Sequence, residues 1–248
     1  MKVGIVVFPG SNCDRDMHHV LRDVFGFDVQ YVWHTKTVPA GTDAVVLPGG
    51  FSYGDRLRAG AIAAHSPVMS DVRRLASEGT PVLGVCNGFQ ILTECGILPG
   101  ALLVNESLGF MCQWTDLVVE NASTPFTSML YVGQRVPIPI ANGEGRYYAD
   151  EDAVRDLQRG GRVVFRYADG SVNGSVGGIA GICSDDGNVV GMMPHPERAA
   201  EYETNPVDCG PARMIFESLA GYAPVQRQRQ RQISHAGRVG GGEGEARP

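Results

Sequence analysis

Short apolar runs alternate along the chain with segments of helical pattern, and this alternation restricts the fold more than any other feature. Residues 2–8 are predicted to form a first buried strand, residues 14–26 a helix and residues 27–33 a second strand. Strands that alternate with helices favour parallel pairing, because each helix carries the chain back across the sheet. The sequence therefore predicts an α/β fold of the flavodoxin-like, doubly wound kind, with a mostly parallel sheet and helices on both faces.

The alternation continues to residue 219 with one interruption. Residues 101–148 are rich in prolines and glycines, and they are expected to form antiparallel strands, at 116–120 and 135–140, and loops inserted over the sheet. The remaining predicted strands are 43–47, 81–85, 163–167 and 188–193, and the remaining predicted helices are 67–78, 87–95, 150–159 and 210–219. Residues 1–222 are therefore expected to form one domain.

Residues 82–90, Val-Leu-Gly-Val-Cys-Asn-Gly-Phe-Gln, lead from an apolar strand through a cysteine into a helical segment. Gly84 and Gly88 lie two residues on either side of Cys86, so the thiol is able to occupy a sharp strand-to-helix turn. A helix N-terminus beside the sulfur stabilises the thiolate, which is the reactive form of cysteine. The segment predicts a nucleophile, although a small buried cysteine without chemistry fits it equally well.

Residues 193–198, Met-Pro-His-Pro-Glu-Arg, supply a candidate base and an acid to orient it. The two prolines keep the segment extended, and residues two apart in an extended chain face the same side. The side chains of His195 and Glu197 are therefore expected to lie together. A surface pair is the commoner role of such residues, but together with Cys86 they form a candidate set of nucleophile, base and orienting acid.

Glycine-containing turns at 8–12, 48–51 and 85–88 follow three predicted strands. In open α/β sheets ligands bind outside the carboxyl ends of the strands, so these turns are expected to converge. The backbone N–H groups of Gly50 and Asn87 are candidates for an oxyanion hole. Gln90, one helical turn after the cysteine, is a candidate substrate contact, and an exposed helix position fits it equally well. Each turn alone is ordinary loop geometry, so only their joint occurrence carries weight.

Composition excludes several classes of function. The 248 residues carry a net charge of −6, and the last 27 contain five arginines against two glutamates, so the body is more acidic still and binding to nucleic acid is not expected. No apolar run reaches the roughly 18 residues of a membrane span. Residues 1–8 fit a core strand rather than a signal sequence, so a cytoplasmic location is expected. The six cysteines include no Cys-x-x-Cys pair, and neither a disulfide framework nor a metal site is expected.

Four strings of the sequence resemble those of class I glutamine amidotransferases: residues 8–14 (Phe-Pro-Gly-Ser-Asn-Cys-Asp), 48–55 (Pro-Gly-Gly-Phe-Ser-Tyr-Gly-Asp), 84–90 and 194–198. The first two are similar in particular to the glutaminase subunits of phosphoribosylformylglycinamidine synthases, which act in purine (IMP) biosynthesis. The resemblance extends from residue 1 to about residue 222. One departure is Asn142, where the family usually has histidine, in a loop expected near the active site or the partner interface.

The resemblance implies a mechanism for the candidate residues. Cys86 would attack the side-chain amide of glutamine, His195 would transfer protons with Glu197 orienting it, and the amides of Gly50 and Asn87 would hold the oxyanion. Ammonia would leave, and water would hydrolyse the resulting thioester to glutamate.

The resemblance also implies partners. A separate synthase subunit would use ATP and magnesium to convert formylglycinamide ribonucleotide and ammonia to formylglycinamidine ribonucleotide, and a small accessory subunit would complete the complex. No cofactor is expected in this chain. Its two lysines, Lys2 and Lys36, lie in no Gly-Lys-Ser/Thr phosphate loop, so ATP is expected to bind elsewhere.

Two other functions fit the same residues. A free-standing thiol hydrolase or stress protein also places a cysteine at a strand-to-helix turn, and a redox sensor would use Cys86 as an oxidisable thiolate. The pairing of His195 with Glu197 favours a nucleophile that must protonate an amine leaving group. Residues 223–248 form an Arg/Gln-rich and then Gly-rich tail, which is predicted to be disordered because it lacks apolar content.

Overall fold

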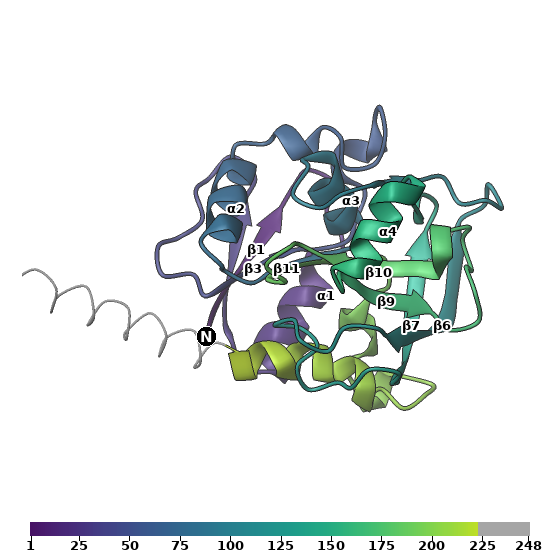
Figure 1. Ribbon diagram of the computed structural model, residues 1–248. Coiled ribbons are helices and arrows are strands. Elements are labelled where there is room, and N and C mark those ends of the chain that lie inside the picture. Colours follow the sequence, from purple (N-terminus) through teal and green to yellow (C-terminus); the bar gives the residue numbers. More distant parts are fainter. Residues whose placement is uncertain (223–248) are drawn as a thin grey trace, which may run out of the picture.

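A nine-stranded sheet with the strand order β2-β1-β3-β4-β11-β10-β9-β6-β7 runs through the computed structural model, which describes residues 1–222 (Figure 1). The strands of this sheet are β1 (Lys2–Val7), β2 (Asp28–Trp33), β3 (Ala44–Leu47), β4 (Val82–Val85), β6 (Met111–Val119), β7 (Arg135–Asn142), β9 (Val163–Tyr167), β10 (Ile179–Cys183) and β11 (Val189–Met192). A second, two-stranded sheet pairs β5 (Ala101–Leu103) with β8 (Arg146–Tyr148). The helices are α1 (Asp14–His19), which continues as a π-helical turn over Val20–Val24, then α2 (Val68–Ser77), α3 (Asn87–Glu94), α4 (Glu151–Arg159) and a closing helix over residues 210–222.

The strands β2-β1-β3-β4-β11 run parallel to one another and form the half of the sheet that carries the candidate site. Their order corresponds to the 2-1-3-4-5 order of flavodoxin-like folds. Helix α1 and the closing helix lie on one face of the sheet, and α2 and α3 lie on the other (Figure 1). Every residue of β3 and β4 is buried, as expected of strands covered on both faces. The predicted fold class is confirmed.

Residues 101–148 differ from the prediction. Their long strands do not lie over the sheet, since β6 pairs antiparallel with β9 and β7 with β6, so that both strands extend the edge of the main sheet. An open edge at β9 would leave backbone N–H and C=O groups without partners, and β6 supplies those partners. Pro137 and Pro139 are tolerated in β7 because it is the outermost strand. The prediction also missed β5, β8 and β10.

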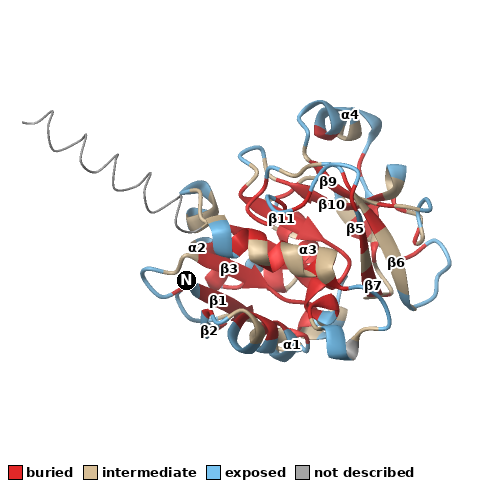
Figure 2. Cartoon of the chain, turned by 90° about the horizontal axis from the view of Figure 1, so that it is seen from below, coloured by how far each residue is buried: buried red, intermediate tan, exposed pale blue. Residues whose placement is uncertain are grey.

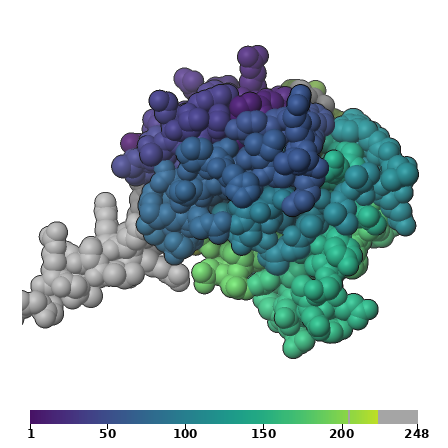
Figure 3. Space-filling model, turned by 90° about the horizontal axis from the view of Figure 1, so that it is seen from above, coloured from purple at the N-terminus to yellow at the C-terminus, as the bar shows by residue number. Residues whose placement is uncertain are grey.

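The core follows the centre of the sheet. In Figure 2 the inner parallel strands β1, β3, β4 and β11 are largely red, which marks buried residues, while the outer faces of α1, α2 and α4 are tan or pale blue. Figure 3 shows that the first hundred residues, purple to blue, gather on one side of the molecule, and that the teal and green residues gather on the other. The site described below lies where the parallel strands end, and the antiparallel half contributes to its wall.

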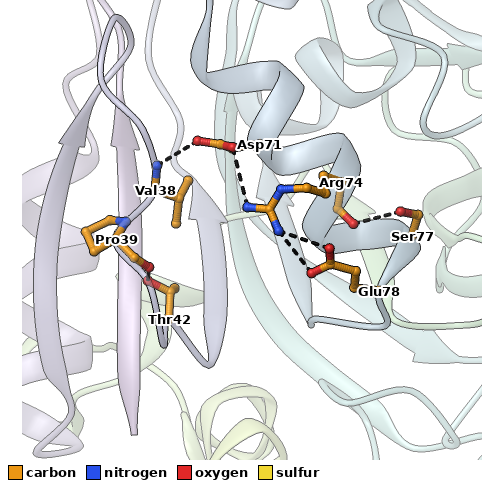
Figure 4. Close-up of polar contacts among 7 residues, drawn as sticks. All are labelled: Val38, Pro39, Thr42, Asp71, Arg74, Ser77 and Glu78. Carbon is orange, nitrogen blue, oxygen red and sulfur yellow. Dashed lines mark hydrogen bonds and ion pairs between the residues drawn. The ribbon is translucent and has the colours of Figure 1, made fainter.

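Helix α2 is tied to the loop before β3 by polar contacts (Figure 4). The carboxylate of Asp71 accepts a hydrogen bond of 2.9 Å from the backbone N–H of Val38 and also pairs with Arg74. Arg74 forms a second ion pair with Glu78, at 3.0 Å. Because Arg74 and Glu78 are about half exposed, their ion pairs add little stability, and the contact of Asp71 with Val38 is the one that positions the loop.

No helix in residues 1–222 is both long and apolar enough to cross a membrane. The tail predicted to be disordered, residues 223–248, lies outside the described residues.

Candidate active site

The cysteine singled out in the sequence lies at the centre of the parallel sheet, directly after β4 and before α3. Cys86 has φ 51° and ψ −107°, a strained conformation typical of residues held at functional turns. A Cβ at Gly88 would lie 1.9 Å from the carbonyl oxygen of Leu47, and a Cβ at Gly84 would lie 2.5 Å from Leu92. Both glycines are therefore required for α3 to approach the sheet this closely. The predicted strand-to-helix turn is confirmed.

The candidate base comes from the next strand of the sheet. β11 runs parallel to β4 and leads into His195, whose backbone N–H donates a hydrogen bond of 2.9 Å to the carbonyl of Pro139 in β7. The Nδ1 atom of His195 lies 2.6 Å from a carboxylate oxygen of Glu197. Both side chains are almost fully buried, with 1% and 0% exposed. The imidazole and the carboxylate lie together, as the sequence predicted, but the predicted extended segment is wrong beyond His195, because Pro196–Ala199 form a 3-10 helical turn that carries Glu197.

Charge determines the protonation of this imidazole. Burial lowers the pKa of His195, but the negative charges of Glu197 and of the Cys86 thiolate outweigh burial and raise that pKa well above the usual value. The Nε2 atom of His195 is buried and has no hydrogen-bond partner. A protonated imidazole with a free Nε2 is able to donate a proton to a leaving amine at neutral pH.

The two candidate oxyanion donors lie on the turns that flank the cysteine. Gly50 follows β3, has φ 149°, and has no space for a Cβ, which would lie 2.8 Å from Cα of Ser11. Asn87 is the first residue of α3, where a helix leaves backbone N–H groups without an intrahelical acceptor. The side-chain oxygen of Asn87 accepts a hydrogen bond of 3.2 Å from the N–H of Ser52. This bond ties the two turns together, and the role of the two amides as oxyanion donors stays a prediction.

The candidate substrate contact, Gln90, is 5% exposed rather than an exposed helix residue. Its side-chain oxygen accepts a hydrogen bond from Asn87 (2.9 Å), and its side-chain nitrogen donates one to the carbonyl of Glu144 (2.6 Å). The amide of Gln90 thus links α3 to the loop between β7 and β8. It also lines the cavity beside Cys86, and its contact with the substrate stays a prediction.

A cavity of about 340 Å³ opens beside the cysteine. Its volume is at the lower end of the range for small-molecule sites. The predicted residues Gly50, Cys86, Gln90 and His195 line it. Sequence reasoning assigned no catalytic or binding role to several further lining residues: Cys13, Asp55, Phe110, Asn142, Glu144 and Arg198. Cys13, Asp55 and Arg198 lie within the family strings. Asn142 and Glu144 belong to the loop expected near the active site or the partner interface, and this loop does line the cavity, although no role was assigned to Glu144.

One group of described residues has donor atoms close enough together for a metal ion. Single donor atoms of Cys13, His195 and Glu197 lie within 4.8 Å of one another. Glu197 is hydrogen-bonded to His195, and the sulfur of Cys13 accepts a hydrogen bond of 3.1 Å from the guanidinium of Arg198. These contacts account for the cluster as part of a proton-transfer site. The expectation that the chain binds no metal stays a prediction.

Comparison with known proteins agrees with this geometry. The model of the CobB/CobQ-like glutamine amidotransferase domain matches residues 1–223. The phosphoribosylformylglycinamidine synthase subunit PurQ of Salinibacter ruber is 51% identical over 232 residues, which are 90% of this chain and 97% of that protein. The PurQ subunit of Moorella thermoacetica is 56% identical over 209 residues, 81% of this chain and 89% of the relative.

Solved structures are similar as well. A chain in the structure of PurLQS from Thermotoga maritima superposes with a TM-score of 0.81 at 44% identity, and the match covers 89% of this chain and 98% of that one. A GMP synthase subunit from Thermoplasma acidophilum, described as putative, has a TM-score of 0.54 at 18% identity, with 92% and 98% covered. The second likeness shows a shared fold alone.

Proposed function

The chain belongs to the family of PurQ subunits of phosphoribosylformylglycinamidine synthase, within the class I glutamine amidotransferases, and from this we infer that it releases ammonia from glutamine for that synthase in purine biosynthesis. The observation that carries the chemistry is the strained Cys86 turn beside the buried His195–Glu197 pair, which follows the adjacent strand β11. Family membership decides between this function and the hydrolase and redox-sensor alternatives that the residues alone left open.

The first half of the reaction forms a thioester. The thiolate of Cys86 attacks the side-chain amide carbon of glutamine, and the N–H groups of Gly50 and Asn87 bind the oxyanion that develops. The imidazolium of His195 donates its Nε2 proton to the amide nitrogen, because a neutral amine is a far better leaving group than its anion. Ammonia leaves, the carbonyl re-forms, and the glutamyl group stays bonded to sulfur.

The second half releases glutamate. His195, now neutral, takes a proton from water through Nε2 while the water oxygen attacks the thioester carbon. The same two amides bind the second oxyanion, and the thiolate of Cys86 leaves as the intermediate collapses. The carboxylate of Glu197 holds Nδ1–H throughout, which fixes the tautomer with Nε2 directed at the reacting atoms and stabilises the imidazolium.

Ammonia must reach a second active site, because nothing in the mechanism above consumes it. The similar T. maritima chain comes from a structure named PurLQS. We assign this chain the corresponding partners, a large synthase subunit that uses ATP and magnesium and a small accessory subunit. Large apolar side chains on the loops that flank the cavity are exposed to solvent, as a docking surface requires. They are Phe51 (45% exposed), Leu57 (91%), Leu108 (84%) and Phe110 (57%).

A cytoplasmic location is part of the proposal. All six cysteines are unpaired, which suits a reducing compartment. The reaction also requires a reduced thiol at Cys86, since an oxidised sulfur cannot attack the amide.

The test measures glutamine-dependent and ammonia-dependent formation of formylglycinamidine ribonucleotide by the complex with the matching synthase and accessory subunits, ATP and magnesium. Wild type is expected to use either nitrogen source, and Cys86→Ala only added ammonium. Cys95→Ala is the matched control, because Cys95 ends α3 outside the cavity lining. Retention of glutamine use by Cys86→Ala would refute the proposed function.

A further inference from the structure

The cavity beside Cys86 contains two carboxylates that the mechanism above does not use. Asp55, in the turn after β3, and Glu144, in the loop between β7 and β8, both line its wall. Their negative charges are close enough to interact, since burial first and then the charge of Glu144 raise the pKa of Asp55 to about 6. A negatively charged pair in a partly enclosed wall is unfavourable by itself and is stabilised by a cation.

The hydrogen-bonding capacity of the pair is only partly used. The Oδ1 atom of Asp55 is buried and has no partner in the structure. Glu144 accepts one hydrogen bond, of 3.3 Å, from the N–H of Ala59, which holds its carboxylate in place. Buried polar atoms in native proteins are almost always paired, so a free buried oxygen in the wall of a ligand cavity is suited to accept a hydrogen bond from a ligand.

A third residue independently indicates a ligand at the same end of the cavity. Asn142 is 3% exposed and lines the cavity, and neither its side-chain oxygen nor its side-chain nitrogen has a hydrogen-bond partner. The amide packs against Gly145, where an added Cβ would lie 2.1 Å from its oxygen. It therefore lies next to the backbone that carries Glu144. A buried amide with both ends free is poorly explained by packing and well explained by a polar ligand.

We propose that Asp55 and Glu144 bind the α-ammonium group of glutamine and make the site specific for an α-amino acid, with the amide of Asn142 as a further polar contact. This inference rests on the proposed function, because the cation is supplied by the substrate whose other end reacts with Cys86. Ammonium groups have three donors and no acceptor, which suits two carboxylates and an amide oxygen. The pair recognises the substrate and takes no part in proton transfer.

The experiment compares glutamine with glutaramate, which is glutamine without its α-amino group, as substrates of the full chain in complex with its synthase and accessory subunits. Glutamate or glutarate release gives kcat and KM for each. Wild type is expected to prefer glutamine by at least about 100-fold in kcat/KM, because two charge-assisted contacts are lost with glutaramate. In Asp55→Asn and in Glu144→Gln the preference is expected to fall at least about tenfold, through KM for glutamine, while kcat/KM for glutaramate changes little.

Three controls separate the possible causes of a negative result. Asp156→Asn removes an exposed carboxylate from α4, outside the cavity lining, and should leave the preference unchanged. Thermal unfolding of each variant, and its co-elution with the synthase in gel filtration, show that the subunit is folded and docked. Glu144→Gln also keeps a side-chain oxygen that accepts the hydrogen bond from the N–H of Ala59. An unchanged preference in both cavity variants overturns the inference, as does an equal loss with both substrates. Failure of wild type to release glutamate from glutamine instead refutes the proposed function.

Discussion

The hydrogen bond between Asn87 and Ser52 joins the two turns that carry the proposed oxyanion donors, and its loss has a magnitude that follows from the structure. In Asn87→Ala the N–H of Ser52 and the side-chain oxygen of Gln90 both lose their partner. Gln90 lines the cavity, so water is able to replace its contact. Ser52 is 2% exposed and does not line the cavity, so its N–H stays unpaired. An orphaned buried donor costs about 1–3 kcal/mol of stability.

That cost is measurable. For a chain of this size about 1 kcal/mol lowers Tm by about 2–4 °C, so Asn87→Ala should lower it by about 2–12 °C. Asn87→Asp is the matched control: it keeps an acceptor for Ser52 and adds a negative charge at the start of α3, where the helix dipole favours it. Its Tm should lie above that of Asn87→Ala, because both variants lose the donor to Gln90 and only Asn87→Asp keeps the acceptor for Ser52. Urea unfolding gives the same comparison as a shift of midpoint at constant slope.

Catalysis provides the second readout. Without the tie, the segment that carries Gly50 is held only by its backbone hydrogen bonds to the turn at 10–13 and is less restrained relative to α3. Glutamine-dependent turnover should therefore fall about 10–100-fold, less than for the loss of a whole oxyanion donor. Ammonia-dependent synthesis should be unchanged. If Asn87→Ala has the stability and the turnover of wild type, the bond does not position the turns and the reasoning is wrong.

Three further predictions concern the same site. Glu197→Gln should lower glutamine-dependent kcat by a factor on the order of 10³–10⁴, since the orienting charge on His195 is lost, and a decrease below tenfold in glutamate release would contradict the proposed role. Gly88→Ala should lower the free energy of unfolding by more than about 3 kcal/mol, as measured by urea unfolding, because its Cβ would lie 1.9 Å from a backbone oxygen. Gly221→Ala is the control, since there is open space around Gly221, and its stability should equal or slightly exceed that of wild type. KM for glutamine should rise as pH falls through about 6, because burial and Glu144 raise the pKa of Asp55 to that value and the protonated carboxyl no longer attracts an ammonium group. Two other charged groups in the cavity wall do not change over this range, since His195 stays protonated and Arg198 stays charged. If the pH profile of Asp55→Asn still shows the rise in KM, another group causes it.

Much of the site could be predicted from the sequence because its parts are local. The glycines around Cys86 restrict the backbone within a few residues, and the structure has the turn that they predict. The contact between His195 and Glu197 was predicted as well, although Pro196 begins a 3-10 helical turn there instead of continuing an extended segment, since proline also fits the first position of a helix. The parallel half of the sheet was equally accessible, since each of its strands is a short apolar run next to a helix of matching pattern. Local restriction of this kind is present in the sequence itself.

Other parts depend on contacts between distant segments. Only the tertiary structure decided that β6 and β7 extend the sheet, because strand periodicity specifies which face is buried but not which edge a strand joins. That pairing places Pro139 where it accepts the N–H of His195, and it places Glu144 with Asp55 in the cavity wall. The sequence by itself therefore determined the reactive groups and the strands that present them. The fold determined the other half of the pocket, because charges and carbonyls that are far apart in the chain interact only after the antiparallel strands have paired.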